Sequence, residues 1–539
     1  MKDTKGTAGR KALASMGAVA LGLVGVAGLA TSAIAADLGN IDPNADSSLT
    51  IHKHIGLPTD LDNNGVELGD VLDLDVAKGI KFKVQEVGVL DQGLQCAALE
   101  VTQAEDWNLI VAAYDTDPAD WGSAKGSYCF TETEFEGETD EKGELKFDSV
   151  NTPNFGLGFY YITETDSSNA VIPGVPDQGV TVVQPVEPFF VTVPYPSYSG
   201  ETGANHVWTY DVHVYPKNQK SDAPGKVIEK RPDSILVGSN LTWTITVPIP
   251  NTLDPLTEAS VYDQLATELK FTDTTIVKIG GVEYTGDGLT RPAADAAGQV
   301  VWSFTGDALA AVNAARSTSD ATIEVTFTTE VVSVPGEGLV ENAPGTPGNG
   351  YGSSFNSKVT GGENTPESYW GQLSILKTDD SATARVLEGA EFKVFEKGTE
   401  GCAAEAPASG EIATGTSGPD GVVLWDGTNP ASAPLDLWIG NWSNVEDDMA
   451  PKNPSKDYCV YETKAPVGYV AGTIANPVTI TPGTIAEGEF TFTVVNAQQD
   501  GPDLPNTGAS GTLLMIIGGT ALVLLSGGLY LVQRRRTKA

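Results

Sequence analysis

The strict alternation of apolar and polar side chains is the feature that most limits how this chain can fold. In residues 241–247, Leu, Trp, Ile and Val alternate with Thr, and in residues 323–328, Ile, Val and Phe alternate with Glu and Thr. Such alternation predicts β-strands with one buried and one exposed face. The 60 glycines and 32 prolines interrupt these segments, and no long amphipathic helix is evident between the two ends. The sequence therefore predicts an all-β array of sandwich-like modules.

An internal repeat predicts where these modules begin and end. Three short segments occur in the same order and with similar spelling in the first and last thirds of the chain: LTIHK, GIKF and YYITET at 49–53, 79–82 and 160–165, and LSILK, GAEF and YCVYET at 373–377, 389–392 and 458–463. The stretch between them lacks this spelling. We therefore expect first and third modules of one design around a different middle module, over residues 36–220, 221–369 and 370–500.

Both ends of the chain carry signals for export and retention. Residues 1–35 combine early lysines and arginines with an apolar stretch that closes in Ala-Ile-Ala, which is typical of a secretory signal peptide cut after Ala35. Residues 501–539 contain an uncharged run, 511–532, followed by three arginines and a lysine. At about 1.5 Å per residue this run can cross a membrane as a helix, with the basic tail in the cytoplasm. We therefore expect a protein that works outside the cell.

The charge and the cysteines narrow the class further. The formal net charge of −39 disfavours binding to nucleic acid or anionic lipid, and the solubility of an exposed protein suffices to explain it. Four cysteines in an oxidising location predict two disulfides, for which three connectivities are possible. We favour the two pairings that each stay within one module, Cys96 with Cys129 and Cys402 with Cys459.

Three motifs identify a family resemblance. The segment before the apolar run resembles the LPxTG sorting signal of Gram-positive surface proteins, and it consists of Leu504, Pro505, Asn506, Thr507 and Gly508. Residues 208–217, WTYDVHVYPK, resemble the pilin motif WxxxVxVYPK. Residues 458–469, YCVYETKAPVGY, resemble the pilin E-box YxLxETxAPxGY, with Val460 in the Leu position. Together they resemble the shaft pilins of sortase-assembled Gram-positive pili, of the SpaA and type 1 or type 2 fimbrial kind, whose tandem immunoglobulin-like modules are of the CNA-A and CNA-B type.

This resemblance implies a substrate of a polymerising enzyme and no catalyst or cofactor. In the family, a pilin-specific sortase takes the carbonyl of the threonine, here Thr507, as a thioester, and a lysine of the next subunit, here Lys217, attacks it. The implied partners are copies of the same chain, tip and basal minor pilins, and a housekeeping sortase that joins the shaft to peptidoglycan. The implied location is the cell wall and the fimbria that extends from it.

The family resemblance also implies covalent cross-links inside each module. In the family, a lysine on the first strand joins an asparagine on the last strand, promoted by a buried Glu or Asp. Burial disfavours both charged forms, so the lysine can be a neutral nucleophile while the protonated acid polarises the amide. For the third module the matching residues are Lys377, Glu462 and Asn496. For the first module the repeat supplies Lys53 and Glu164, and the residue after the pilin motif supplies Asn218.

The middle module offers two candidate lysines. The family pattern assigns Asp263 as the acid and Asn356 as the amide donor. Lys226 and Lys230 lie four residues apart and both could supply the amine, and we choose Lys226 because it comes earlier and lies beside apolar Val227.

Other functions have weaker support in the sequence. The segment 60–65 begins like a calcium loop, but Val71 stands where a glutamate is needed, and His52 and His54 lack partners at metal-ligand spacing. A monomeric wall-anchored adhesin would share the signal, the anchor and the β modules but would have no use for the pilin motif. A basal pilin stays possible, and a surface hydrolase would need a catalytic motif that we do not find.

Overall fold

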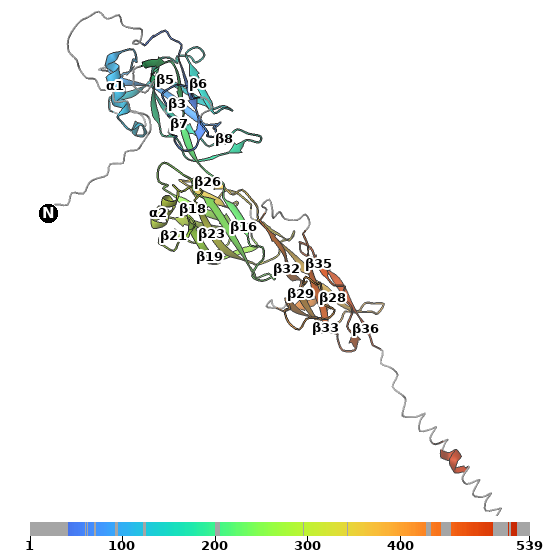
Figure 1. Ribbon diagram of the computed structural model, residues 1–539. Helices are drawn as coiled ribbons and strands as arrows, with labels where there is room; N and C mark the ends of the chain where they lie inside the picture. The colour runs from blue at the N-terminus through green and yellow to red at the C-terminus, as the bar shows by residue number, and fades with distance from the viewer. Residues whose placement is uncertain are drawn as a thin grey trace, which may run out of the picture. The chain divides into compact units, whose positions relative to one another are not determined.

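The structure is a computed structural model, and it describes most of residues 41–499 (Figure 1). The description excludes residues 60, 62, 69–71, 92–94, 122–125, 200–204, 295, 342, 427–432 and 444–453, and beyond residue 499 it covers only 516 and 519–524. The predicted signal peptide and the segment 504–508 lie outside the described residues. Among the residues described, no helix is long and apolar enough to cross a membrane, and most of the predicted span 511–532 is not described.

The first module consists of several small sheets around an aromatic core. The sheets follow the orders β14-β1-β6, β10-β15-β2 and β11-β7-β3-β4, and β5 also pairs with β3. Their strands are β1 (Ser48–His52), β2 (His54–Ile55), β3 (Lys81–Leu90), β4 (Cys96–Ala98), β5 (Tyr128–Glu138), β6 (Glu144–Asp148), β7 (Gly158–Asp166), β10 (Thr181–Gln184), β11 (Phe189–Val193), β14 (Asp211–Val214) and β15 (Lys217–Ser221). Two hairpins add β8 (Val171–Ile172) with β9 (Gln178–Gly179), and β12 (Tyr195–Ser199) with β13 (Asn205–Thr209).

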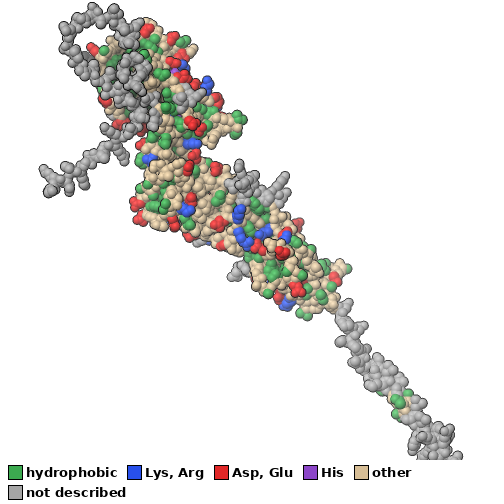
Figure 2. Space-filling view, in the orientation of Figure 1, with side chains coloured by type: hydrophobic (Ala, Val, Ile, Leu, Met, Phe, Trp, Pro, Cys, Tyr) green, Lys and Arg blue, Asp and Glu red, His purple; other side chains and the backbone are tan. Residues whose placement is uncertain are grey.

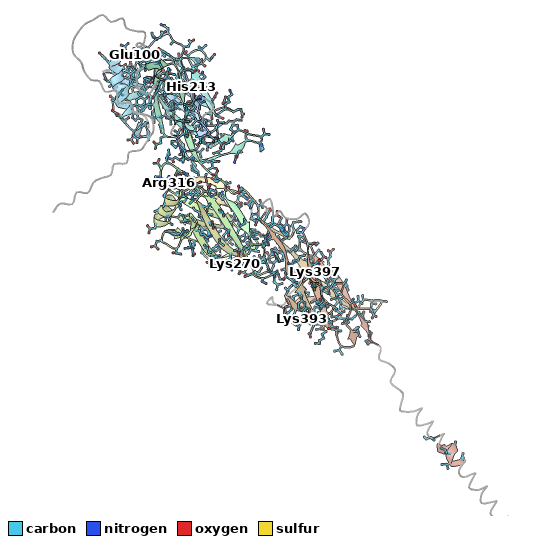
Figure 3. The ribbon with its side chains drawn as sticks, in the orientation of Figure 1. Glu100, His213, Lys270, Arg316, Lys393 and Lys397 are labelled. Carbon is cyan, nitrogen blue, oxygen red and sulfur yellow. A yellow bond between two sulfur atoms is a disulfide. The ribbon has the colours of Figure 1, made fainter. Side chains whose placement is uncertain are left out.

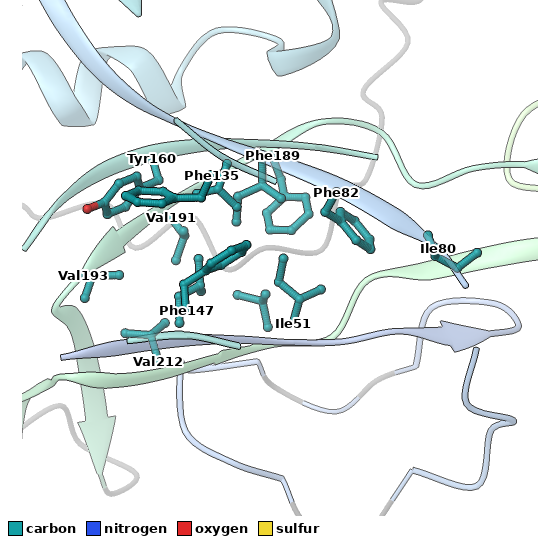
Figure 4. Close-up of a cluster of buried hydrophobic side chains, with 14 of the residues drawn as sticks. Ile51, Ile80, Phe82, Phe135, Phe147, Tyr160, Phe189, Val191, Val193 and Val212 are labelled. Carbon is teal, nitrogen blue, oxygen red and sulfur yellow. The ribbon is translucent and has the colours of Figure 1, made fainter. Parts of the chain in front are cut away.

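The core of this module lies between the sheet that contains β1 and the sheet that contains β3. Figure 4 shows Ile51, Phe147 and Val212 from the first sheet facing Phe82 and Tyr160 from the second. These side chains occupy alternate positions of their strands, because successive residues of a strand point to opposite faces. The alternation in the sequence therefore positions the aromatic core.

The middle module packs two five-stranded sheets against each other. The first has the order β16-β17-β23-β19-β20 and the second the order β21-β22-β18-β25-β26. Their strands are β16 (Gly225–Ile228), β17 (Asn240–Pro248), β18 (Ala259–Gln264), β19 (Leu269–Ile279), β20 (Val282–Glu283), β21 (Leu289–Thr290), β22 (Gln299–Phe304), β23 (Thr322–Val331), β25 (Gly352–Phe355) and β26 (Lys358–Gly361). Strands β17 and β23 carry the alternating segments of the sequence and pair antiparallel along their whole length. Both show strict alternation of buried and half-buried residues, which confirms the predicted strands.

The third module repeats the strand pairing of the first. It contains the sheets β31-β30-β29-β33-β35 and β28-β36-β34. Their strands are β28 (Ile375–Asp379), β29 (Glu391–Glu396), β30 (Ala413–Ser417), β31 (Val423–Trp425), β33 (Lys456–Lys464), β34 (Tyr469–Val470), β35 (Val478–Ile480) and β36 (Phe492–Gln498). Strands β29 and β33 align Phe392 with Glu462, as β3 and β7 align Phe82 with Glu164. Both pairs have an irregularity one residue before the phenylalanine, so the repeated spelling corresponds to a repeated register.

The first strand of each repeated module pairs in parallel with the last. Strand β28 pairs with β36, and in the first module β1 pairs with β14 and β2 pairs with β15. A parallel pair cannot be closed by a tight hairpin turn, so the intervening chain must form the rest of the module. This pairing brings the two ends of each module side by side.

Two features differ from the sequence-based expectation. In the described residues 41–499, two short α-helices occur, α1 (Ala104–Tyr114) and α2 (Gly306–Ala315), and each buries only two residues, which explains why the apolar pattern gave no helical signal. The chain also forms two compact units, and residues 438–454 belong to the unit that contains residues 1–370 instead of joining the predicted 370–500 module. Within that unit Trp438 N, in the middle of β32 (Leu435–Trp442), donates to Ile235 O at 2.9 Å. Strand β32 forms a sheet with β24 (Leu339–Glu341) and β27 (Glu367–Leu373).

Both predicted disulfides are confirmed. Cys96 is bonded to Cys129 and Cys402 to Cys459. The first bond joins β4 to β5 and closes the segment that contains α1. Each bridge stays within one module, and no free cysteine remains.

The first core provides a test of this architecture. Phe147 is 6% exposed within the aromatic cluster, whereas Val150, three residues later, is 72% exposed. Phe147→Ala should lower the free energy of unfolding by about 3–5 kcal/mol, because it removes a buried ring and leaves a cavity. Val150→Ala should change it by less than about 0.5 kcal/mol. Urea titration followed by tryptophan fluorescence measures both, and equal effects of the two changes would contradict the assigned core.

Candidate functional site

In the first module, three polar side chains meet in the interior. Lys53 Nζ lies 2.9 Å from Glu164 Oε2 and donates to Asn218 Oδ1 at 2.5 Å. Asn218 Nδ2 donates to Glu164 Oε1 at 2.8 Å, which closes a triangle of amine, amide and carboxyl group. Lys53 and Asn218 are fully buried. The structure therefore brings together the three residues that the sequence selected for this module.

The strand pairing explains how residues far apart in sequence meet here. Lys53 lies between β1 and β2, and the parallel register of β2 and β15 aligns Ile55 with Asn218. Glu164 reaches the same point from β7, in the sheet on the other side of the core. The lysine and asparagine thus come from neighbouring strands and the carboxyl group from the facing sheet.

Burial favours the neutral form of the Lys53 amine. It lowers the pKa of Lys53 to about 8, although the neighbouring Glu164 opposes this shift. A buried lysine with such a pKa is partly neutral near physiological pH, and a neutral amine is a nucleophile. The carbon of the Asn218 amide is the electrophile within its reach.

The third module contains the same set of groups in a looser arrangement. Asn496 Nδ2 donates to Glu462 Oε1 at 2.7 Å, and Lys377 Nζ lies 4.0 Å from the same oxygen. Lys377 Nζ also donates to Val494 O at 2.9 Å, and burial lowers its pKa to about 8. Lys377 and Asn496 are fully buried on the paired strands β28 and β36.

In the middle module, a buried lysine and aspartate form a close pair. Lys226 Nζ lies 2.5 Å from Asp263 Oδ2, and both side chains are inaccessible to solvent. The aromatic rings of Trp243, Phe327 and Tyr351 surround the ammonium, with centroids 4.4, 5.3 and 5.5 Å from Nζ. Burial lowers the pKa of Lys226. Lys230, in contrast, is exposed, so the geometry favours Lys226 of the two lysines.

The structure does not bring Asn356 to this pair, which corrects the sequence-based assignment. Asn356 follows β25 directly at a φ of 50°, and its Oδ1 accepts from Thr257 N at 2.8 Å. A left-handed backbone with a local side-chain bond is typical of asparagine in turns. Asn364 is nearer, but its Oδ1 accepts from the backbone N of Lys226 and not from Nζ.

Lys217 and Asn218 use the two faces of one strand. Asn218 points into the core, whereas Lys217 is half-buried and its Nζ donates to Tyr215 O at 3.0 Å. Burial lowers the pKa of Lys217. Upstream in the same motif, Trp208 packs on Trp107 of α1 with ring centroids 5.4 Å apart. The amine of Lys217 is therefore held near the surface by the backbone just before its strand.

Two histidines join the first strand to the strand that leads to Lys217. His52 Nε2 and His213 Nδ1 are 2.7 Å apart, and the ring of Tyr215 stacks on His52 at 4.6 Å. Glu144 and Asp211 lie beyond the two ends of the pair, at 3.6 and 3.4 Å. Figure 3 locates His213 in the first module. Within the described part of the chain, no group of three or more His, Cys, Asp or Glu side chains could hold a metal ion.

The histidine pair predicts a pH dependence of stability. Burial, with smaller contributions from His213 and His54, lowers the pKa of His52 to about 4. The folded state then binds this proton less readily than the unfolded state, so stability falls below about pH 6.5 and the loss is complete near pH 4. His52→Gln should remove a pH-dependent contribution of up to about 3 kcal/mol in this window. Urea titrations at several pH values test it, and an unchanged slope in the variant would contradict the assignment.

Comparison with known proteins gives the context of these sites. Residues 44–219 match the family model for Gram-positive pilin subunit D1, N-terminal domain, and residues 497–539 match the model for the LPXTG cell wall anchor motif. The chain thus contains a Gram-positive pilin domain and a cell wall anchor motif. Over its whole length the pilin is 29% identical to fimbrial subunit type 2 of Actinomyces naeslundii, covering 98% of that protein. Fimbrial subunit type 1 of Actinomyces viscosus is 26% identical over 96% of the chain and 97% of the relative.

A solved structure supports the same fold. The full-length major pilin SpaD from Corynebacterium diphtheriae matches 86% of the pilin and 99% of its own chain, with a TM-score of 0.55 and 23% identity. The first family model ends at residue 219, directly after Lys217 and Asn218, so the matched domain includes the first strand pairing and the first triad. The pilin is thus a structural subunit and not an enzyme.

Proposed function

We propose that the pilin is the repeating shaft subunit of a covalent cell-surface pilus, in which the Thr507 carbonyl of one subunit is joined to the Lys217 amine of the next. The observation that carries this proposal is the position of Lys217 in the strand. Its amine is half-buried near the surface at the end of the motif segment, while Asn218 is fully buried on the opposite face. One strand can therefore offer a nucleophile to a sortase without disturbing the core.

The environment of Lys217 suits the chemistry of transfer. A lysine attacks a thioester only as the neutral amine, and burial lowers the pKa of Lys217 in that direction. The hydrogen bond from Nζ to Tyr215 O holds the amine beside its own strand. A pilin-specific sortase would supply the thioester by cleaving between Thr507 and Gly508.

The remaining partners follow from the location at the cell wall. The anchor motif at residues 497–539 supports attachment of the pilus to the wall of a Gram-positive bacterium. We propose that a housekeeping sortase makes the bond to peptidoglycan and that minor pilins occupy the tip and the base. Figure 2 shows Asp and Glu side chains spread over the visible face, in keeping with a formal net charge of −39 and a solvated surface.

Replacing Lys217 tests the polymer linkage. In cells that carry the pilin and its sortases, Lys217→Ala should abolish the ladder of SDS-resistant, high-molecular-weight species in cell-wall extracts, because the acceptor amine is lost. Lys220→Ala is the matched control, since Lys220 lies on the same strand outside the motif, and it should leave the ladder unchanged. A ladder that persists in the Lys217 variant would favour a different acceptor. No ladder in either the variant or the parent would favour a monomeric wall-anchored adhesin.

We also propose that each module is closed by one isopeptide bond. In the first and third modules, Lys53 would join Asn218 and Lys377 would join Asn496, with Glu164 and Glu462 as the proton-transferring groups. The support is the short distances among fully buried groups described above. Such a bond converts a buried, costly ion pair into a neutral amide and releases ammonia.

For the middle module, we propose that Asn342 is the partner of Lys226. Asn342 lies outside the described residues, so the proposal rests on its neighbours in sequence. It directly follows β24, and on its other side Ala343 O accepts a hydrogen bond from Tyr351 N at 3.2 Å. The ring of Tyr351 lies 5.5 Å from Lys226 Nζ. The described neighbour of Asn342 is thus bonded to the residue whose ring lies beside the lysine.

Intact mass measurement tests the three bonds. The mature chain should be lighter than its sequence by three ammonia molecules, and tryptic mapping should find the three joined peptides. Asn342→Ala should lose one ammonia fewer, whereas Asn356→Ala should match the parent chain. The reverse result for these two variants would restore Asn356 as the partner, and two losses in the parent chain, with Lys226 unjoined, would remove the middle bond.

A further inference from the structure

The asparagine of each repeated triad accepts a hydrogen bond from a backbone N–H group that the family motifs do not include. Val186 N donates to Asn218 Oδ1 at 2.7 Å in the first module. Gly472 N donates to Asn496 Oδ1 at 2.7 Å in the third module. The same contact at the same length thus occurs in two modules whose surrounding sequences differ.

The hydrogen-bond network fixes the orientation of both amides. In the first module, two donors, Val186 N and Lys53 Nζ, lie on one side of the Asn218 amide and the Glu164 carboxyl group lies on the other. The side with the donors must be the carbonyl oxygen, because an amide NH2 cannot accept. In the third module Gly472 N donates to Asn496 Oδ1 and also to Glu462 Oε2 at 2.9 Å, while Asn496 Nδ2 donates to Glu462 Oε1, so the oxygen of this amide again faces the backbone donor. The amide nitrogen, which becomes the leaving group, therefore faces the carboxyl group in both modules.

This orientation divides the chemistry between two groups. The neutral lysine attacks the amide carbon, a bond forms between Nζ and Cγ, and the carbonyl oxygen takes up negative charge. The carboxyl group accepts a proton from Nζ and delivers it to Nδ2, so that the bond between Cγ and Nδ2 breaks and ammonia leaves. Lysine amine and asparagine amide thus give one secondary amide and one ammonia molecule. The negative charge of the intermediate develops on the oxygen that the backbone N–H already contacts.

We propose that the backbone N–H groups of Val186 and Gly472 form oxyanion sites that stabilise the tetrahedral intermediates of isopeptide formation. The inference rests on the proposed isopeptide bonds and adds a catalytic group to them. It assigns stabilisation of the carbonyl oxygen to the backbone N–H and keeps the glutamate as the proton-transferring group. Preorganised donors of this kind accelerate acyl transfer because they need no rearrangement when the charge appears.

Local structure explains why these two N–H groups can contact the asparagine oxygens. Val186 lies between β10 and β11, outside both strands, so its N–H is not used by a strand ladder. Gly472 lies after β34, and a Cβ atom at this position would be 2.4 Å from Val495 O and 3.0 Å from Asn496 Oδ1. Glycine is therefore the residue that lets the backbone approach the asparagine so closely.

The test compares two substitutions of Val186 in the full mature chain. Val186→Pro removes the N–H, whereas Val186→Ala shortens the same side chain and keeps the N–H. The chains are made by cell-free synthesis under oxidising conditions, and the joined Lys53–Asn218 peptide is quantified by mass spectrometry over time. Val186→Pro should slow this bond by roughly 100-fold to 1000-fold, in the range found for loss of one oxyanion donor, and Val186→Ala should not slow it. The Lys377–Asn496 bond of the same molecules is the internal control and should form at the parent rate in both.

The outcomes separate this inference from the proposed function. Equal rates of Lys53–Asn218 joining in Val186→Pro and Val186→Ala would overturn the oxyanion site while leaving the isopeptide bond intact. No joining of Lys53 and Asn218 in the parent chain would overturn both at this module.

A second variant covers the case in which Val186→Pro prevents folding of the first module, which protease sensitivity would reveal. Gly472→Ala keeps the N–H but must displace it from Asn496, so it should slow only the Lys377–Asn496 bond. An unchanged rate in that variant would count against the proposal.

Discussion

The parallel pairing of first and last strands is the interaction on which the repeated modules depend. It places Lys53 beside Asn218, 165 residues away, and Lys377 on the strand beside Asn496. Bringing such distant segments together costs chain entropy, which the rest of the module must offset through burial. A cross-link between these strands would lower the conformational entropy of the unfolded chain as well. The contact whose formation costs the most chain entropy would then be held by a covalent bond.

Burial of charged groups is the second constraint, and the three modules meet it differently. A lysine in an apolar core is destabilising unless it is paired or neutral. In the first and third modules the amine has an amide and a carboxyl group nearby. In the middle module Asp263 and three aromatic rings surround Lys226, and ring faces attract an ammonium. In each module the carboxyl group comes from a strand in the sheet that faces the lysine. Each site is therefore defined by one pair of neighbouring strands and one strand of the facing sheet.

Much of this could be predicted from the sequence because the signals lie in side chains. Repeated spelling located Lys53, Glu164, Lys377 and Glu462, and period-two alternation located β17 and β23. The residues that could not be predicted depend on backbone geometry. Val186 acts through an N–H group that every residue except proline has, so its residue type does not mark it, and Gly472 is one of 60 glycines in the chain. The turn at Asn356 could not be predicted either, because an asparagine in a turn and one at a strand end look alike in sequence, and only its left-handed φ separates them.

The adjacency of Lys217 and Asn218 has a mechanical consequence for a covalent fibre. A pulling force that arrives from a neighbouring subunit through the Lys217 amine enters β15 one residue away from Asn218. If Asn218 is bonded to Lys53, the force passes across a single peptide unit into the first strand and need not be carried by the hydrogen bonds between β15 and its neighbours. Those hydrogen bonds would then stabilise the fold of the module without carrying the pulling force. The fibre would extend at its loops and junctions before the strands of any sheet separated.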